Sequence, residues 1–163
     1  MNVREQARAT GLDDATLWLL AFAFVLAAMH ITDHVLRVDH SGWPFRSEVT
    51  PFTFSLLAFP MLLFALFGPR RLYWWRWALL LVATIATVLA HVAVETPHMQ
   101  FAMWAYDRSS DPHQQGFHNI PHIEARALGV LAMIVSMALN VTAVTSTIAM
   151  FARGLRNRAS TSR

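Results

Sequence analysis

Histidines and carboxylates recur at helical spacing in two apolar segments of the sequence. His30, Asp33 and His34 occupy positions i, i+3 and i+4, and His91 and Glu95 stand four residues apart. Side chains at these spacings project from one face of an α-helix. Two imidazoles one helical turn apart can bind a single metal ion, and a carboxylate can be a further ligand or orient an imidazole. The spacing therefore predicts a site for a transition metal.

The expected metal ligands share an imidazole or carboxylate near one end of a helix: His30, His34, His91, His122 and Glu95. Asp33 and Glu124 are expected to orient these ligands. Nitrogen and oxygen ligands suit copper, zinc or iron, and the absence of cysteine excludes a thiolate site. Haem is the alternative cofactor, with His30 and His91 on the two sides of the iron.

The same residues also fit a purely structural role. Asp33 could pair with Arg37, and Glu95 with Arg126, in ion pairs that only stabilise the fold. Because histidine titrates near neutral pH, the cluster could also respond to pH.

The five residues His30-x-x-Asp33-His34 resemble the H-x-x-E-H motif of inverted zinc peptidases. Aspartate stands here in place of the catalytic glutamate and is one methylene shorter. The resemblance implies a zinc-dependent peptidase as a further alternative. The sequence contains no serine-hydrolase, phosphate-loop or dinucleotide-binding motif.

The segments that carry these residues are long and apolar. Apolar residues make up 55% of the chain and charged residues 14%, compared with about 25% charged in soluble domains. A membrane-spanning helix needs about 20 largely apolar residues. Four segments are close to that length: 15–36, 50–68, 73–94 and 127–152. We therefore expect one all-α domain over residues 1–163. It would be an antiparallel four-helix bundle in the membrane, with a long outer loop between its third and fourth helices.

Prolines and an asparagine mark features of these helices. Pro60 lies inside the second segment and is expected to kink it. Asn119, two residues before Pro121, is expected to begin the fourth helix. The first segment is expected to remain in the protein, because no small-residue cleavage site follows it.

The arginines predict the orientation in the membrane. With four spans, both termini and the 67–72 connection face one side, which holds nine of the 13 arginines; the chain has no lysine. Arginine-rich connections face the cytoplasm. We therefore expect a cell-membrane protein with both termini in the cytoplasm. All eight histidines, His40 among them, and seven of the ten carboxylates, Asp39 among them, then lie toward the outer side.

Polar residues also occur inside the predicted spans. Thr87, Ser136 and Asn140 are expected to form hydrogen bonds between helices, the common role of such residues in membranes. A proton or ion path along the third helix is the alternative.

The predicted outer loop, residues 96–121, is long for a compact bundle and contains several histidine, methionine and aromatic residues. Long ordered loops often cover a site or contact a partner. The expected partners are the lipid bilayer and a membrane protein bound through this loop. Nucleic acid is not an expected partner, because the arginines form no patch interleaved with aromatic residues.

Two functions follow from these observations. The first is a small membrane protein with an outward-facing histidine and carboxylate site that binds a transition metal or haem, whether or not it catalyses a reaction. The second is a non-catalytic accessory or structural subunit of a larger membrane complex, docked through its outer loop.

Overall fold

The computed structural model of the chain describes Glu5, residues 9–37 and residues 41–161, so His40 and Asp39 lie outside the described residues. Every regular element in this part of the chain is helical. The long helices are α2 (Asp14–Arg37), α5 (Tyr73–Leu89) and α7 (Arg126–Thr161). Three segments are long and apolar enough to cross a membrane: Asp14–Arg37, Arg70–Val94 and Arg126–Ala159. The all-helical class and a membrane-protein character are thus as the sequence predicts.

The second apolar segment differs from the continuous helix that the sequence predicts. It consists of α3 (Pro51–Ser55) and α4 (Ala58–Phe67), separated by a turn at Leu56 and Leu57. Pro60 explains the position of the break. It has no N–H to donate to the carbonyl of Leu56, four residues earlier, and its ring clashes with that same carbonyl in a regular α-helix. In place of a kink at Pro60, the structure has a turn at Leu56 and Leu57, and both of these residues keep right-handed helical backbone angles.

The third apolar segment begins with a turn that is tighter than an α-helix and ends with a turn that is wider. The 3₁₀ turn η1 (Arg70–Leu72) leads into α5, and the π-helical turn η2 (Ala90–Val94) follows it. Such wide turns occur mostly as single turns and often at functional sites. Here the turn contains His91 and is followed directly by Glu95.

The predicted outer loop contains a helix, α6 (Pro97–Tyr106), which the sequence analysis did not predict. Thr96 caps it by accepting a hydrogen bond from the backbone of Met99, and Pro97 occupies its first turn, where a missing N–H costs nothing. The helix packs against α7. A Cβ at position 129 would lie 2.8 Å from the backbone oxygen of Phe101, so Gly129 permits this close approach.

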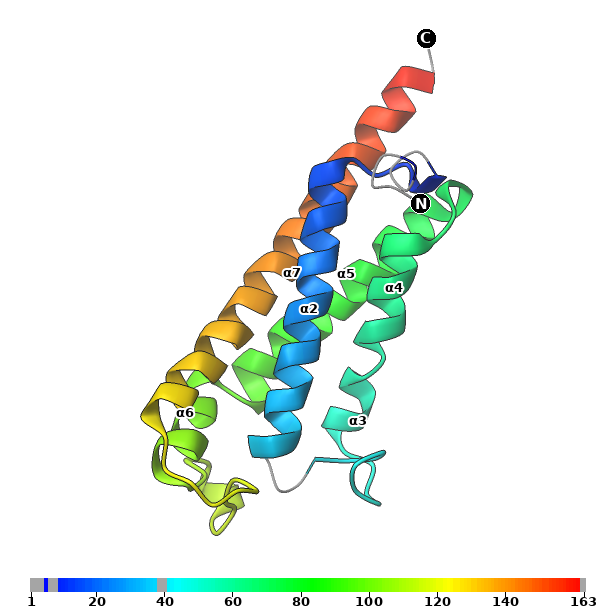
Figure 1. The fold of residues 1–163 in the computed structure, drawn as a ribbon. Helices are drawn as coiled ribbons and strands as arrows, with labels where there is room; N and C mark the ends of the chain where they lie inside the picture. Colours follow the sequence, from blue (N-terminus) through cyan, green and yellow to red (C-terminus); the bar gives the residue numbers. More distant parts are fainter. Residues whose placement is uncertain (1–4, 6–8, 38–40, 162–163) are drawn as a thin grey trace.

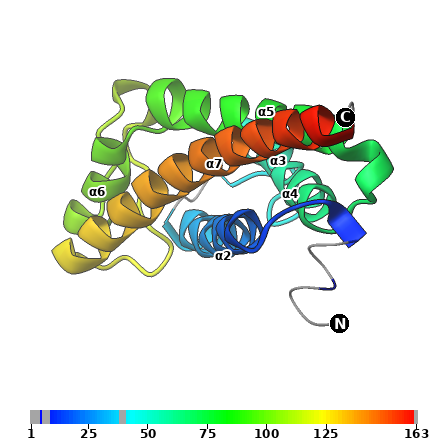
Figure 2. The ribbon, with the colours of Figure 1, turned by 90° about the horizontal axis from the view of Figure 1, so that it is seen from above.

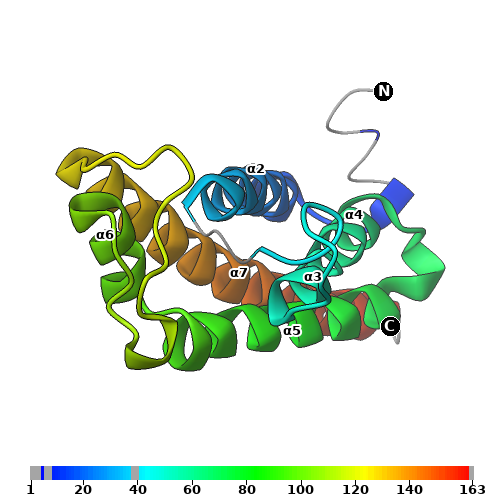
Figure 3. The same cartoon turned by 90° about the horizontal axis from the view of Figure 1, so that it is seen from below.

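The four longest apolar elements form a ring in which each contacts two neighbours. α2 packs against α4 and α7, and α5 packs against the same two helices (Figures 1 and 2). The start of α2, the turn between α4 and α5, and the end of α7 lie at one end of the molecule. At the other end, α3 lies beside the end of α2, and α6 lies beside the start of α7 (Figure 3).

Buried leucines and small residues fill the centre of this ring, while large apolar side chains remain exposed around it. Leu20, Leu80 and Met150 are at most 1% exposed. The outward-pointing apolar side chains on α5 and α7 include Val82, Ile85, Leu89, Ile134, Val141 and Ile148. An apolar exterior of this kind is unfavourable in water and suits a lipid environment.

A fully buried arginine joins three segments at the end of the molecule where α5 begins. Arg76 donates from Nη1 to the backbone oxygen of Thr10 at 2.6 Å and from Nε to that of Phe64 at 3.2 Å. Its Nη2 donates to the backbone oxygen of Ala65. The last carbonyls of a helix have no partner within the helix, so this side chain satisfies them for α4.

Candidate metal centre and the buried polar network

His30 and His91 meet between α2 and the end of α5, as their helical positions predict. Their Nε2 atoms are 3.0 Å apart, and their ring centroids are 4.7 Å apart. His91 Nδ1 lies 2.7 Å from the backbone oxygen of Thr87, which can only accept, so Nδ1 carries a proton. When His91 is neutral, its Nε2 accepts from the Nε2–H of His30. His30 Nδ1 is then an acceptor, and this buried atom has no hydrogen-bond partner.

The distance between the two Nε2 atoms bears on which cofactor they could share. Two nitrogens bound to one tetrahedral ion at about 2.0–2.1 Å lie roughly 3.3 Å apart, close to the observed 3.0 Å. Haem needs its two axial nitrogens on opposite sides of the iron, about 4 Å apart, with the macrocycle between them. The histidine pair therefore fits a single ion better than haem.

Arg37 occupies the centre of a buried charge network beside this pair. Its side chain is 1% exposed, and Nε donates to Asp33 Oδ2 at 2.8 Å. Both guanidinium end nitrogens donate to Glu95, Nη1 to Oε1 and Nη2 to Oε2 at 3.3 Å. The indole N–H of Trp104, from α6, donates to Asp33 Oδ1 at 2.8 Å. α2, α6 and the residue after η2 are thus joined by one network.

This network decides the roles of the two carboxylates. The Asp33–Arg37 pair is the structural ion pair that the sequence suggested. Glu95 pairs with Arg37 and not with Arg126, whose guanidinium lies 6.0 Å from the ring centroid of Tyr106. Because both oxygens of Glu95 contact Arg37, the structure places this residue in the ion pair and not as an open metal ligand.

His34, also an expected ligand, lies at the edge of the network. Its Nε2 is 3.5 Å from Glu95 Oε2, and its Nδ1 is 3.3 Å from the hydroxyl oxygen of Ser41. The ring stacks on Phe52 with centroids 4.3 Å apart. Its centroid is 6.4 Å from that of His30. Its two ring nitrogens thus face other side chains.

The polar residues expected to link helices make a mixture of contacts. Ser136 accepts a hydrogen bond from Gln100 of α6 at 3.2 Å, a contact between helices. Asn140 donates to the backbone oxygen of Ser136 within α7. Thr87 contributes its backbone oxygen, which accepts from His91 Nδ1. The side-chain oxygens of Gln100 and Asn140 are buried without a partner, as is His30 Nδ1. In the described part of the chain, the hydroxyl oxygen of Thr50 is also buried without a partner.

A second group of possible ligands lies in the loop between α6 and α7. A carboxylate oxygen of Asp107 and one ring nitrogen from each of His118 and His122 lie within 4.8 Å of one another. Asp107 Oδ2 is 3.2 Å from His118 Nδ1 and 3.3 Å from His122 Nδ1. The structure thus places His122 with Asp107 and His118, in a different group from His30 and His91.

Asn119 fixes the loop that carries this group. Its fully buried amide donates to the backbone oxygens of Met103 and Ile123, and its side-chain oxygen accepts from the N–H of Ile123. Its own N–H donates to Asp107 Oδ1 at 2.8 Å. Asn119 therefore folds the loop and does not begin the fourth helix, which starts at Arg126.

Two residues of the group adopt left-handed backbone conformations. Asp107 ends α6 with φ of 47°, and His122 has φ of 52°. Few residues other than glycine adopt this region, and aspartate and histidine are among those that do so most often. Burial raises the pKa of Asp107, but the N–H of Asn119 and the rings of His122 and His118 outweigh it, so the pKa stays below its ordinary value. The carboxylate is therefore ionised at neutral pH, as a metal ligand must be.

Sequence reasoning did not single out Asp107 or His118 as ligands. His118 and His122 have helical spacing but do not lie on a helix, and Asp107 is eleven residues before the first of them. Only the loop conformation brings the three together. Glu124, expected to support the site, is exposed.

Comparison with models of protein families, with curated proteins and with solved structures gave no match to this chain.

Proposed function

We propose that this chain is a four-span membrane protein that binds a transition metal ion at its outward end. The three long apolar segments and the pair α3–α4 would cross the bilayer, with both termini in the cytoplasm. Pro51–Phe67 reaches about 25 Å at 1.5 Å per residue, slightly less than the 30 Å hydrocarbon layer. In support, η1 and the end of α7, both rich in arginine, lie at the same end of the molecule.

One observation carries the metal proposal: Asp107, His118 and His122 present three ligand groups within 4.8 Å of one another. His118 Nδ1 lies 2.6 Å from the backbone oxygen of Asp107 and donates to it, so an ion bound at this nitrogen would replace that hydrogen bond. His118 and His122 have side chains that are 49% and 68% exposed, so an ion can reach them from the water. Two imidazoles and a carboxylate with open coordination positions suit zinc or iron(II). A water in an open position would be acidified by the ion, which gives such a site hydrolytic potential.

The buried pair His30 and His91 is a second candidate ion site. Their Nε2 atoms lie 3.0 Å apart, and an ion would replace the hydrogen bond that now joins them. The buried His30 Nδ1 has no hydrogen-bond partner. Metal-binding histidines commonly donate their other N–H to a carbonyl, as His91 does to Thr87. Here an ion would be enclosed by α2 and α5 and not exposed to water.

Cobalt(II) titration followed by visible absorption tests both sites. The wild-type protein should bind Co²⁺, and H118A/H122A should bind it at least ten-fold more weakly. The matched control H98A/H113A removes two histidines that are exposed and outside both groups, and it should bind as the wild type does. If instead H30A/H91A alone weakens binding, the buried pair is the site. If no variant changes binding, or the wild type binds no ion, the accessory-subunit function with docking through residues 96–121 is the better account.

A further inference from the structure

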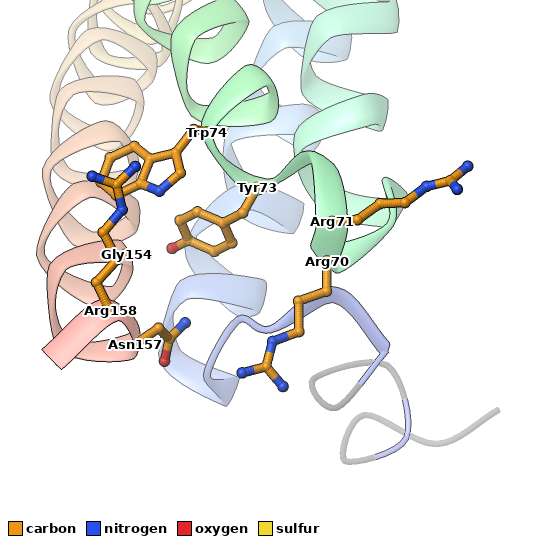
Figure 4. A pocket seen from close by; sticks show the side chains of 7 residues that line it. All are labelled: Arg70, Arg71, Tyr73, Trp74, Gly154, Asn157 and Arg158. Carbon is orange, nitrogen blue, oxygen red and sulfur yellow. The ribbon is translucent and has the colours of Figure 1, made fainter. Parts of the chain in front are cut away.

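A basic hollow lies where α5 begins and α7 ends, at the opposite end of α5 from His91 (Figure 4). Its volume is about 450 Å³. Three arginines line it: Arg70 and Arg71 from η1, and Arg158 from the last turns of α7. The proposed metal sites involve none of them.

Aromatic residues form a fixed wall for this hollow. A Cβ at position 154 would lie 2.9 Å from the rings of both Trp74 and Tyr73, so Gly154 lets these rings lie directly against α7. The Tyr73 hydroxyl donates to the backbone oxygen of Met150 at 2.6 Å. The guanidinium carbon of Arg158 is 4.4 Å from the centre of the Trp74 ring, a cation–π contact that orients the charge. The hollow therefore has an ordered charged group beside a rigid apolar wall.

The three arginines are found in none of the ion pairs between described residues. Within the described part of the chain, no carboxylate forms an ion pair with Arg70, Arg71 or Arg158. The ion pair at this end is that of Arg156 with Asp13, at 3.8 Å. Figure 4 shows Arg70 and Arg71 leaving η1 in different directions: Arg70 extends on the side of Asn157, and Arg71 extends away from the other lining residues. A guanidinium can form two parallel hydrogen bonds with a phosphate, and it binds one more specifically than a lysine does.

The position of the hollow indicates where such a phosphate would come from. Arg70 begins one membrane-spanning segment, and Arg158 lies at the end of another, Arg126–Ala159. In a bilayer, both ends would lie at the level of the lipid headgroups. Basic pockets between membrane helices on the cytoplasmic side are typical sites for anionic headgroups.

We propose that this hollow binds the phosphate of an anionic phospholipid, held by Arg70 and Arg158, with Arg71 at the rim. The site requires that α5 and α7 cross the bilayer, but it does not require that the protein bind a metal. The lipid tails would then lie along the exposed apolar surface of α5, where Trp75 is 69% exposed.

Native mass spectrometry of the full chain in bilayers of equal phosphatidylglycerol and phosphatidylcholine tests this site. The wild type should retain phosphatidylglycerol in preference to phosphatidylcholine. In R70Q/R158Q the ratio of the two retained lipids should be at least five-fold lower. The control R108Q/R126Q removes the same charge at the other end. There the two guanidinium carbons lie 5.6 and 6.0 Å from the ring centre of Tyr106, so this control also removes two cation–π contacts.

Three results would overturn the proposal. The first is a wild type without lipid preference, and the second is an equal loss of the preference for phosphatidylglycerol in both double variants. The third is full displacement of the lipid by millimolar inorganic phosphate, which would indicate a soluble anion as the ligand. Arg70 and Arg158 are exposed, so folding should tolerate their replacement. If R70Q/R158Q nevertheless fails to fold, the single variant R158Q gives the same comparison against R108Q, with a smaller loss expected.

Discussion

Arg37, the last residue of α2, forms a two-point ion pair with Glu95, the residue that follows the π-helical turn after α5. Arg37 is almost fully buried, and Asp33 holds the same guanidinium from within α2. The pair joins two helices that do not follow one another in the chain, directly beside His30 and His91. We conclude that it fixes the spacing of the histidine pair.

Breaking this pair should strongly destabilise the protein. Arg37→Met removes the arginine partner of two half-buried carboxylates, Asp33 and Glu95, and removal of one partner of a buried pair costs about 3–5 kcal/mol. Unfolding in mixed micelles should show such a loss. The control Arg126→Met, which removes an arginine over an aromatic ring, should cost below about 1 kcal/mol. Equal losses in the two variants would show that the Arg37 network contributes little.

Asp13 should make the stability of α2 depend on pH. It caps the helix: its Oδ1 accepts from the N–H of Thr16 at 2.9 Å and from its hydroxyl at 2.6 Å. Burial raises the pKa of Asp13, but these hydrogen bonds and the charges of Arg153 and Arg156 outweigh it, so the pKa lies below its ordinary value of 3.8. Asp13→Ala should cost about 1 kcal/mol.

The sign of this pH effect follows from proton binding. Because the folded state binds a proton at Asp13 less readily than the unfolded state, the stabilisation is complete above about pH 4 and is lost as the pH falls through the lower folded pKa. Thermal unfolding in detergent should show the difference between wild type and Asp13→Ala shrinking in acid. A difference that grows below pH 4 would be inconsistent with the lowered pKa.

Asn119 should control both the stability of the outer loop and metal binding. Asn119→Ala removes the side-chain donor to the buried carbonyl of Met103 and to the carbonyl of Ile123, at about 1–3 kcal/mol for a buried group left unsatisfied. Mutation of residues that orient metal ligands lowers the affinity for the metal by about 10–100-fold. We expect a comparable loss of Co²⁺ affinity in this variant, and none in His113→Ala. Unchanged affinity would mean that Asn119 does not position the ligands.

Much of the helical framework could be predicted from the sequence, because long apolar runs and arginine placement follow from the physics of the bilayer. His30 and His91 were expected to be ligands of one site, and the structure brings their rings into contact, but spacing within each helix does not predict a contact between two helices. The break before Pro60 was only partly foreseen, since proline shows where a hydrogen bond is missing but not whether the helix bends or ends.

The ligand grouping could not be predicted because it depends on contacts between distant residues. Glu95 had two possible arginine partners, and only the packing of α2 against the η2 turn selects Arg37. His122 was grouped with His30 and His91, whereas in the structure it lies with Asp107 and His118. The helix α6 was not foreseen, and Asp107 lies at its end. The Thr96-Pro97 pair was a readable signal for that helix.

Orientation in the membrane can be tested separately from metal binding. A reporter active only outside the cytoplasm, fused after residue 163, should be inactive, because the arginine-rich end with the last turns of α7 should face the cytoplasm. The same reporter inserted at Gly116, in the outer loop with φ of 89°, should be active. The reverse pattern would place the histidines on the cytoplasmic side.

The metal content of the purified protein tests the central claim most directly. Protein prepared without chelator and analysed for zinc, iron and copper should carry close to one equivalent of one of these metals. D107N and H118A/H122A should each lose most of it, while H98A/H113A retains it. Helical content measured by circular dichroism should be the same in all four proteins. Equal metal content in the wild type and H118A/H122A, or no metal in a folded wild type, would contradict the proposed loop site.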